Sequence, residues 1–272
     1  MTVLGAARTA RSLLFVPGDR PDRFDKALDA GAGLVVVDLE DAVRPGSRAT
    51  AREAASKALS DGMPVAVRVN ACGTRDHEAD LQVLGGQPAV VMLAKASSAA
   101  DIDRVSSRLA AGSAVIALVE TAAGALAARD LAAHDSVVRL AFGALDLAAE
   151  IGVDPDDREI LAPIRASLVL ASAAAGLAGP VDGVTAVVDD LEGLAADVAH
   201  ARRLGFGGRM CIHPRQVAIT EQGFEPSAAE LAWARRLLES ASAGGVCIVD
   251  GAMVDKPVLD RARRILGKAT LR

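Results

Sequence analysis

The sequence predicts an α/β fold, a (βα)8 or TIM barrel with a C-terminal helical lid extension. Short β-branched runs alternate with helix-length, alanine-rich stretches, as in parallel strands that are joined by crossover helices. Eight such runs occur, which is the strand count of a closed barrel. Polar residues follow the C-terminal end of almost every run, where barrel enzymes carry their chemistry.

The predicted strands are Leu13–Val16, Leu34–Leu39, Val65–Val69, Val90–Leu93, Val115–Val119, Val138–Phe142, Gly183–Val188 and Arg209–Ile212. They are almost entirely apolar, which indicates parallel strands that are buried on both faces. An open sheet shares this pattern, so the polar residues at the run ends are what favour closure. We assign residues 1–225 to the barrel. Residues 226–272 form an appendage, in which two helical stretches flank a loop-like segment, GGVCIVDGAMVDKP.

Composition restricts the partners and the compartment. The formal net charge is -5, and acidic and basic residues are interspersed, so the chain lacks the basic patch that a nucleic acid partner requires. The three cysteines are far apart and odd in number, which argues against a disulfide framework and a zinc site. No apolar run suits a signal peptide or a membrane span. We therefore expect a cytoplasmic protein with no membrane partner.

Two carboxylates are candidates for a metal site. Glu120 ends one predicted strand and Asp146 follows the next, so both are expected at the same rim of the barrel. Two hard oxygen ligands suit Mg²⁺, with water and substrate oxygens completing the coordination, and Mn²⁺ fits the same ligands. The alternative is that each carboxylate caps the helix that follows it.

An acidic segment follows the second predicted strand. Asp38, Glu40 and Asp41 lie within four residues in DLEDAV, a density that favours nearby cations or metal-bound water. The alternative is a solvated loop that caps the next helix. Arg68 ends the next strand, and its planar fork suits a substrate carboxylate, although it could instead pair with an acid of this segment.

Lys95 and the opening turn add basic candidates. Lys95 has the placement of a Schiff-base lysine, but the Glu120 and Asp146 pair offers a metal-dependent way to polarise a carbonyl. Arg20, Arg23 and Lys26 surround the start of the first helix, where a nucleotide-like cofactor could place its phosphates. This turn is neither a Walker A loop nor a GxGxxG motif.

Eight blocks, in order from about Arg11 to Leu266, resemble the citrate lyase beta subunit-like family, which includes malyl-CoA and citramalyl-CoA lyases. The blocks are RSLLFVPGDRPDRFDKA, VVDLEDAV, VAVRVN, VMLAKA, ALVET, FGALDLAAEIG, GRMCIHPRQV and DGAMVDKPVLDRARRIL. The resemblance implies a Mg²⁺-dependent carbon-carbon lyase that cleaves a β-hydroxyacyl-CoA to acetyl-CoA and pyruvate or glyoxylate, or catalyses the reverse reaction. It also implies a coenzyme A thioester and a 2-oxo acid as small-molecule partners.

The resemblance also implies residue roles. Glu120 and Asp146 would bind the metal, and Arg68 would grip the oxo-acid carboxylate. Coenzyme A would contact Phe15, Arg20 and Lys26 in the opening turn, while Glu40, Asp41 and Lys95 would support catalysis. The backbone of Gly143, Ala144 and Leu145 would assist substrate binding.

Asp255 resembles a catalytic acid that reaches into the site of a neighbouring subunit. Residues 226–272 would then be a lid that packs on that subunit in a homotrimer or hexamer. One departure concerns Ala94, because many relatives have LPKA where this chain has LAKA.

Alternative functions remain open from sequence. One is a citrate lyase beta subunit that acts on an acyl-carrier protein, and another is a malyl-CoA thioesterase. A third is a class II aldolase that does not use coenzyme A. A non-catalytic barrel is disfavoured, because Glu120, Asp146, Arg68 and Asp255 together would be a costly set of charges for packing alone.

Overall fold

The computed structural model describes residues 2–84, 86–240, 247–249 and 252–269. These divide into two compact units, residues 1–223 and 224–272. Parts of the loop-like segment predicted at 244–257, namely 244–246 and 250–251, lie outside the described residues. Each unit is described by itself below.

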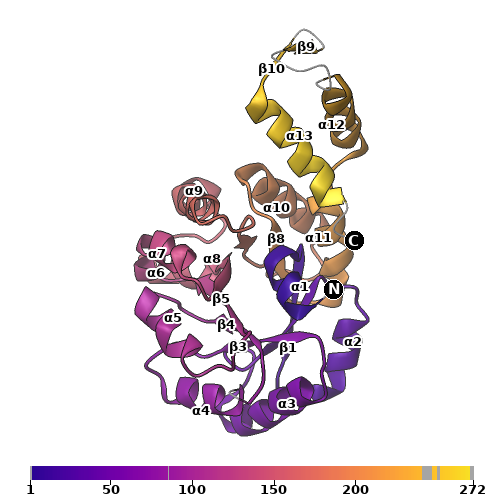
Figure 1. The fold of residues 1–272 in the computed structure, drawn as a ribbon. Helices are drawn as coiled ribbons and strands as arrows, with labels where there is room; N and C mark the ends of the chain where they lie inside the picture. Colours follow the sequence, from indigo (N-terminus) through magenta and orange to yellow (C-terminus); the bar gives the residue numbers. More distant parts are fainter. Residues whose placement is uncertain (1, 85, 241–246, 250–251, 270–272) are drawn as a thin grey trace. The chain divides into compact units, whose positions relative to one another are not determined.

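The first unit is a closed barrel of eight parallel strands, which confirms the predicted fold class (Figure 1). Neighbouring strands are consecutive in sequence, and the barrel closes where Leu13 of the first strand pairs with Met210 of the last. The strands are β1 Ser12–Pro17, β2 Leu34–Asp38, β3 Val65–Val69, β4 Val90–Leu93, β5 Ala114–Val119, β6 Val137–Phe142, β7 Val181–Asp182 and β8 Gly208–Cys211.

The prediction of the seventh strand was wrong. The apolar run at 183–188 is a loop, and β7 is the pair Val181–Asp182 that follows Pro180. Both residues of β7 are buried, whereas Val187 is 64% exposed. The β-branched run thus lines the rim of the barrel instead of its wall.

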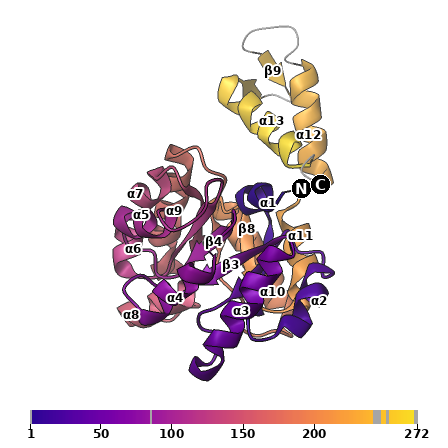
Figure 2. The same ribbon diagram turned by 60° about the horizontal axis from the view of Figure 1, so that its bottom comes forward.

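Helices surround the barrel, as Figures 1 and 2 show from two sides. The α-helices of this unit are α1 Val3–Thr9, α2 Phe24–Leu28, α3 Arg48–Ser60, α4 Arg75–Leu84, α5 Ala99–Ser106, α6 Ala122–Leu126, α7 Ala128–Ala133, α8 Ala144–Ile151, α9 Arg158–Ala174, α10 Leu191–Leu204 and α11 Val217–Phe224. Three short 3-10 helices are η1 Pro21–Arg23, η2 Pro45–Ser47 and η3 Pro214–Gln216. Short polar residues accept backbone N–H bonds at several helix starts, including Ser98, Thr121, Asp157 and Asp190.

An aliphatic core fills the barrel. Leu13, Met92, Ile116, Leu118 and Met210 belong to one buried cluster, which also includes residues of α1. Burial of such side chains supplies the main favourable term in folding. The loops that follow the strands form a polar end above this core, and the candidate site lies at that end.

The second unit contains two helices and a hairpin. Helices α12 Ala228–Ser240 and α13 Lys256–Ala269 pack through a small core that includes Ala234, Leu237, Val254 and Ala262. The predicted loop-like segment contains two antiparallel strands, β9 Cys247–Val249 and β10 Ala252–Val254, so the loop assignment was wrong there. A two-strand hairpin of three-residue strands is too short to show a clear period in sequence.

None of the helices in the described part of the chain is both long enough and apolar enough to span a membrane.

Candidate active site

The C-terminal ends of β1 and β3 and the segments that follow β2, β5, β6, β7 and β8 enclose a cavity of about 350 Å³ at one end of the barrel. Acidic residues line one part of it, and apolar residues line the rest. The lining includes Phe15, Asp38, Asp41, Arg68, Leu118, Glu120, Gly143, Ala144, Leu145, Asp146, Val184, Met210 and Ile212. We call this the acid cavity. The structure therefore gathers residues here that are as far apart in sequence as Phe15 and Ile212.

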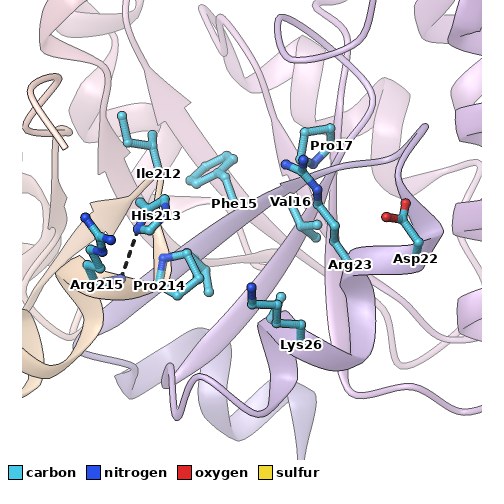
Figure 3. A pocket seen from close by; sticks show the side chains of 12 residues that line it. Phe15, Val16, Pro17, Asp22, Arg23, Lys26, Ile212, His213, Pro214 and Arg215 are labelled. Carbon is cyan, nitrogen blue, oxygen red and sulfur yellow. Dashed lines mark hydrogen bonds between the residues drawn. The ribbon is translucent and has the colours of Figure 1, made fainter.

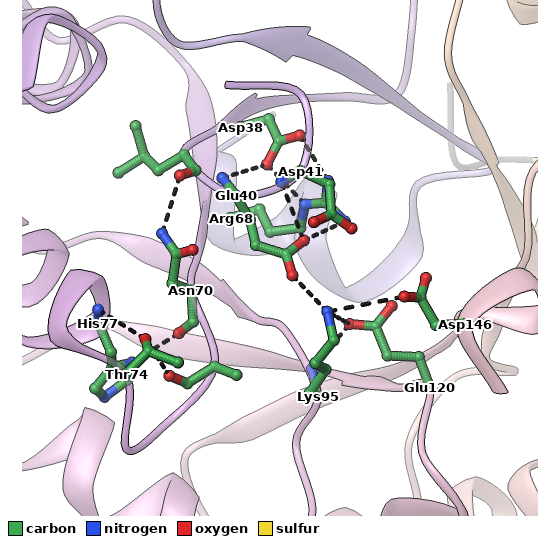
Figure 4. A network of polar contacts seen from close by, with 12 residues as sticks. Asp38, Glu40, Asp41, Arg68, Asn70, Thr74, His77, Lys95, Glu120 and Asp146 are labelled. Atoms are coloured by element: carbon green, nitrogen blue, oxygen red, sulfur yellow. Dashed lines mark hydrogen bonds and ion pairs between the residues drawn. The ribbon is translucent and has the colours of Figure 1, made fainter. Parts of the chain in front are cut away.

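Arg68 is held by two acids of the DLED segment. Its Nε and Nη2 donate to the two carboxylate oxygens of Asp38 at 2.7 and 2.6 Å, and Nη1 lies 3.1 Å from Glu40 Oε2 (Figure 4). Arg68 thus pairs with acids of the DLED segment, which was one of the two roles that the sequence left open for it. Because a guanidinium carries five N–H donors, Asp38 and Glu40 occupy only part of the set.

Lys95 lies among three carboxylates. Its Nζ donates to Glu40 Oε1 at 2.6 Å and lies 3.9 Å from Glu120 Oε1 and 3.8 Å from Asp146 Oδ1 (Figure 4). Burial alone would lower the pKa of Lys95, but the hydrogen bond to Glu40 and the charge of Glu120 raise it above its ordinary value. The ammonium therefore stays charged at neutral pH and serves as a counter-ion, not as a free amine.

The backbone of Lys95 also contributes. Its φ is 52°, a left-handed conformation that no other non-glycine residue adopts in the part of the chain that the structure describes. Its N–H donates to Glu120 Oε1 at 2.9 Å. One residue thus holds Glu120 through its backbone and Glu40 through its side chain.

Glu120 is 3% exposed, and burial, together with the charges of Glu40 and Asp146, raises its pKa to about 8 against the opposing effect of Lys95. Burial likewise raises the pKa of Glu40, although Arg68 and Lys95 oppose the shift. Clustered carboxylates in a buried site repel one another, and a cation between them relieves that repulsion. The cluster therefore favours positive charge.

The segment after β6 approaches Glu120 closely. A side chain at Gly143 would overlap Cβ and Oε2 of Glu120, so only glycine fits there. Asp146 lies in the first turn of α8, and its side chain is 40% exposed. The first N–H groups of a helix have no acceptor within the helix, so those of Ala144 and Leu145 at the cavity wall are suited to an oxyanion.

Glu120 and Asp146 fit a hard divalent cation. Among the residues described, no three or more His, Cys, Asp and Glu side chains form a complete metal cage. Mg²⁺ does not require one, since it commonly uses one or two carboxylates and keeps water or substrate oxygens as further ligands. The two acids, with the excess of negative charge around them, would hold such an ion.

A second cavity, of about 680 Å³, lies between the opening turn and the segment after β8 (Figure 3). Its lining includes the cations Arg23, Lys26 and Arg215 as well as His213. It shares Phe15, Pro17 and Ile212 with the acid cavity, so the two adjoin. We call it the basic cavity.

Arg20 does not line the basic cavity, contrary to the expectation that it contacts a cofactor there. Its Nε and Nη2 instead bind Asp22 at 2.9 and 2.7 Å, and both side chains are exposed. Arg23, which the sequence also offered as a phosphate contact, lines the cavity together with Lys26.

The sequence did not indicate that His213 and Arg215 line the basic cavity. His213 is partly exposed, and its Nδ1 accepts from the backbone N–H of Arg215 at 3.2 Å. These residues follow β8, and only closure of the barrel brings them beside the opening turn. The predicted residues Phe15 and Lys26 do line the basic cavity.

Asp255 belongs to the second unit. It directly precedes α13, it is exposed, and its Oδ1 accepts from the backbone N–H of Val258 at 3.3 Å. Within one chain it thus caps a helix, and its carboxylate remains open to solvent.

Comparisons with known proteins agree with this geometry. Residues 11–214 match the family model described as HpcH/HpaI aldolase/citrate lyase. A citrate lyase subunit beta-like protein of Mycobacterium tuberculosis is 40% identical over 94% of each chain. A (3S)-malyl-CoA thioesterase of Cereibacter sphaeroides is 35% identical over 97% of this chain and 95% of that protein.

A solved structure is also similar. CitE of Mycobacterium tuberculosis, in complex with magnesium, acetoacetate and coenzyme A, aligns with a TM-score of 0.85 and 38% identity, over 97% of this chain and 99% of CitE. Nearly the whole chain therefore shares both sequence and fold with these proteins. The chain belongs to the HpcH/HpaI aldolase/citrate lyase family, as its motifs predicted, and is a carbon-carbon lyase of the citrate lyase beta-like group.

Proposed function

We propose that the enzyme cleaves a β-hydroxyacyl-CoA such as citramalyl-CoA or malyl-CoA to acetyl-CoA and pyruvate or glyoxylate, or catalyses the reverse reaction, with Mg²⁺ as cofactor and Mn²⁺ as a substitute. The observation that carries the proposal is the junction of the acid cavity with the basic cavity at Phe15, Pro17 and Ile212. The reacting oxygens of such a substrate would bind a metal ion held by the acid cavity. The phosphates of its coenzyme A part would bind the cations of the basic cavity. The solved CitE complex with magnesium and coenzyme A supports the same ligands here.

Glu120 and Asp146 would hold Mg²⁺, which when bound supplies a Lewis acid that stabilises negative charge on substrate oxygens. Lys95 and Glu40 fix the position of Glu120 through the contacts described above. Asp41 lines the cavity beside them and would hold water that completes this shell. Arg68 would direct its remaining N–H groups to the carboxylate of the oxo-acid, assisted by the backbone of Gly143, Ala144 and Leu145.

The basic cavity would bind coenzyme A through Lys26 and, in place of the expected Arg20, through Arg23. Phe15 would contact the pantetheine arm where the cavities meet. During cleavage the substrate hydroxyl gives its proton to solvent water and its oxygen becomes the carbonyl oxygen of the 2-oxo acid. The electron pair of the breaking carbon-carbon bond passes to the acetyl-CoA enolate. A proton then returns to the enolate carbon, and Asp255 is our candidate for the donor.

We further propose that Asp255 acts in the site of a neighbouring subunit, that residues 226–272 form the lid, and that the assembly is a homotrimer or hexamer. A carboxylate beside the second unit's hairpin, open to solvent, supports this role. The free thiols Cys72 and Cys211 favour a cytoplasmic location, because reducing conditions preserve thiols.

A second candidate function is hydrolysis of malyl-CoA, which the 35% identical (3S)-malyl-CoA thioesterase supports. In that reaction water attacks the thioester carbonyl and coenzyme A leaves as its thiol. An acyl-carrier protein substrate, or an aldol substrate without coenzyme A, would leave the basic cavity without its expected ligand.

A substrate panel tests the proposal. Purified enzyme with Mg²⁺ is given citramalyl-CoA, malyl-CoA, citryl-CoA and the corresponding free acids, and 2-oxo acid, acetyl-CoA and free thiol are each measured. We expect equal amounts of 2-oxo acid and acetyl-CoA from a coenzyme A thioester. Free thiol without 2-oxo acid would select the thioesterase, and cleavage of the free acids alone would select the aldolase.

A further inference from the structure

A buried hydrogen-bond network centred on Asn70 lies next to the DLED segment (Figure 4). Asn70 follows β3 and is 5% exposed. Its side-chain Nδ2 donates to the backbone oxygen of Leu39 at 2.9 Å and to Oδ2 of Asp80 at 2.7 Å. Leu39 lies between Asp38 and Glu40 in the chain. The network therefore reaches the acidic segment of the site, although Asn70 does not line the acid cavity.

The side chain of Asn70 replaces a backbone bond at the point where a strand ladder ends. Pairing of β2 with β3 ends at Asp38 and Arg68, and the N–H of Leu39 continues it by donating to Arg68 O at 3.0 Å. In a parallel ladder the next bond would run from the backbone N–H of Asn70 to Leu39 O. That N–H instead donates to Asp80 Oδ2 at 2.9 Å, and the side-chain amide serves Leu39 O. The chain thus leaves the barrel wall here while Leu39 stays bound.

Asn70 is itself fixed by helices α3 and α4. Asp80 of α4 has a fully buried side chain, and its Oδ1 accepts from Nε of Arg52 of α3 at 2.7 Å. The buried His77 of α4 donates from Nδ1 to the backbone oxygen of Asn70 at 2.7 Å. An amide nitrogen between two acceptors suits this place, whereas aspartate has the same shape but no donor when ionised. The contacts therefore fix both the residue type and its orientation.

The acids on either side of Leu39 set the cations of the acid cavity. Asp38 binds Arg68 through both of its carboxylate oxygens. Glu40 Oε2 lies 3.1 Å from Arg68 Nη1, and Glu40 Oε1 accepts from Lys95 Nζ at 2.6 Å. Because both acids are neighbours of Leu39 in the chain, a shift of its peptide groups would move them. The positions of Arg68 and Lys95 would change with them.

We propose that Asn70 is a positioning residue, whose side-chain amide fixes the DLED segment and thereby keeps Arg68 and Lys95 in place for the reaction. It acts through these residues and does not touch the substrate. The effect on catalysis rests on the proposed lyase reaction, whereas the effect on the segment does not. The two effects are therefore measured separately.

Asn70→Ala removes the amide and leaves the buried oxygen of Leu39 without this donor. Asn70→Ser keeps one donor on a shorter side chain and is a milder second variant. Ser12→Ala is the matched control, because Ser12 is buried at the start of β1, at the opposite end of the barrel, and its Oγ also makes hydrogen bonds to distant elements.

Hydrogen–deuterium exchange of the metal-free protein measures how firmly the segment is held. Mass spectrometry follows peptides that cover residues 38–43, where the backbone N–H groups of Leu39, Glu40 and Ala42 are hydrogen-bonded. Steady-state kinetics with Mg²⁺ and the best coenzyme A thioester give kcat and KM. The thermal midpoint of each variant is recorded alongside.

In Asn70→Ala we expect exchange in residues 38–43 to quicken about tenfold or more, because a buried acceptor loses its donor. We expect kcat to fall roughly 10–100-fold, as for other residues that support a metal site, with KM nearly unchanged because the basic cavity is untouched. Asn70→Ser should show smaller effects of the same kind. Ser12→Ala should match wild type in exchange of this segment and in kcat, even if its thermal midpoint falls as far.

Exchange of the segment in the Asn70 variants that is no faster than in Ser12→Ala would overturn the proposal. A wild-type kcat in a variant with faster exchange would overturn it as well. If wild type cleaves no coenzyme A thioester, the proposed reaction is wrong, and the exchange comparison still decides whether Asn70 holds the segment.

Discussion

Two charged clusters lie at the same end of the barrel and differ in how completely their charges are paired. In the acid cavity, Arg68 and Lys95 face four carboxylates, those of Asp38, Glu40, Glu120 and Asp146. In the second cluster, between β7, β8, α9 and α10, the buried Arg165 and Arg209 are paired with Asp182 and Asp197, and Arg158, which also contacts Asp197, is 46% exposed. The first cluster thus lacks positive charge, whereas the buried charges of the second are matched.

The difference indicates the role of each cluster. A charge buried without full compensation is expensive, so an imbalance that persists in a folded protein points to a ligand of the opposite sign. Near Glu120, where the pKa rises to about 8, that ligand is a cation. Near Arg165 and Arg209, Asp182 and Asp197 already supply the opposite charge, so the cluster serves to hold β7, β8, α9 and α10 together.

The largest expected effect comes from Asp146→Ala. We expect cleavage of the best coenzyme A thioester to fall at least about a hundredfold, because loss of a proposed metal ligand should exceed the effect of changing residues that only support the ligands. The fold should survive, since the Asp146 side chain is 40% exposed. Steady-state kinetics over a range of Mg²⁺ concentrations and the thermal midpoint measure the two effects.

Asp156→Ala is the matched control, because Asp156 is an exposed acid that lines neither the acid cavity nor the basic cavity. It should leave cleavage nearly unchanged. Wild-type cleavage that persists in excess chelator would argue against metal dependence altogether.

The second prediction asks whether the acid cavity is completed by another subunit. Asp255→Ala and Asp146→Ala should each be inactive, and mixing them under conditions of subunit exchange should restore part of the activity. The reason is that a mixed assembly can pair an intact Asp146 with an intact Asp255. Activity is measured after exchange is verified by mass spectrometry of tagged subunits, and absence of restoration despite exchange would rule out a shared site.

The fold was predictable because its strands are local apolar runs. The pair Glu120 and Asp146 was also predictable, since neighbouring parallel strands bring their C-terminal ends to one rim. The seventh strand was not, because a two-residue strand has no period, and the exposed run after it has the stronger β-branched pattern.

Features that depend on packing between distant elements escaped the sequence. Arg165 lies inside α9 and Arg209 inside β8, and only the packing of helix on strand brings both to Asp182. Arg20, whose contact with coenzyme A stays a prediction, pairs with Asp22 in the structure, and the sequence did not indicate that pairing. Local sequence patterns thus locate the strand ends. Which acid pairs with which arginine depends on packing between distant elements and is seen only in the structure.

The third prediction concerns the stability of the second charged cluster, the wall that Arg165, Asp182, Asp197 and Arg209 form between β7, β8, α9 and α10. Arg165→Met removes one of the two guanidinium contacts of buried Asp182 and the cation 5.0 Å from the Phe142 ring. We expect the free energy of unfolding to fall by about 3 kcal/mol, as for breaking a buried ion pair. For a chain of this size that lowers the thermal midpoint by roughly 6–12 °C.

Arg158→Met is the comparison, because Arg158 also contacts an acid of this wall, but its side chain is 46% exposed. Solvent screens such a pair, so its loss should cost less than about 1 kcal/mol. Equal shifts of the thermal midpoints of Arg165→Met and Arg158→Met would mean that burial does not increase the contribution of Arg165 to stability.

The smallest expected effect separates the backbone of Lys95 from its charge. Lys95→Gly and Lys95→Ala both remove the ammonium from Glu40, Glu120 and Asp146, but only alanine retains a Cβ at a φ of 52°. The glycine variant should be more stable by about 1 kcal/mol, the cost of the left-handed conformation for a residue with a side chain. Denaturant titration measures the difference, and equal stabilities would mean that the backbone relaxes. A strained residue persists where surrounding contacts fix it. In Lys95 that conformation lets the backbone N–H hold Glu120 while the ammonium holds Glu40. The difference in unfolding free energy between the two variants would therefore measure the strain that accompanies these two contacts.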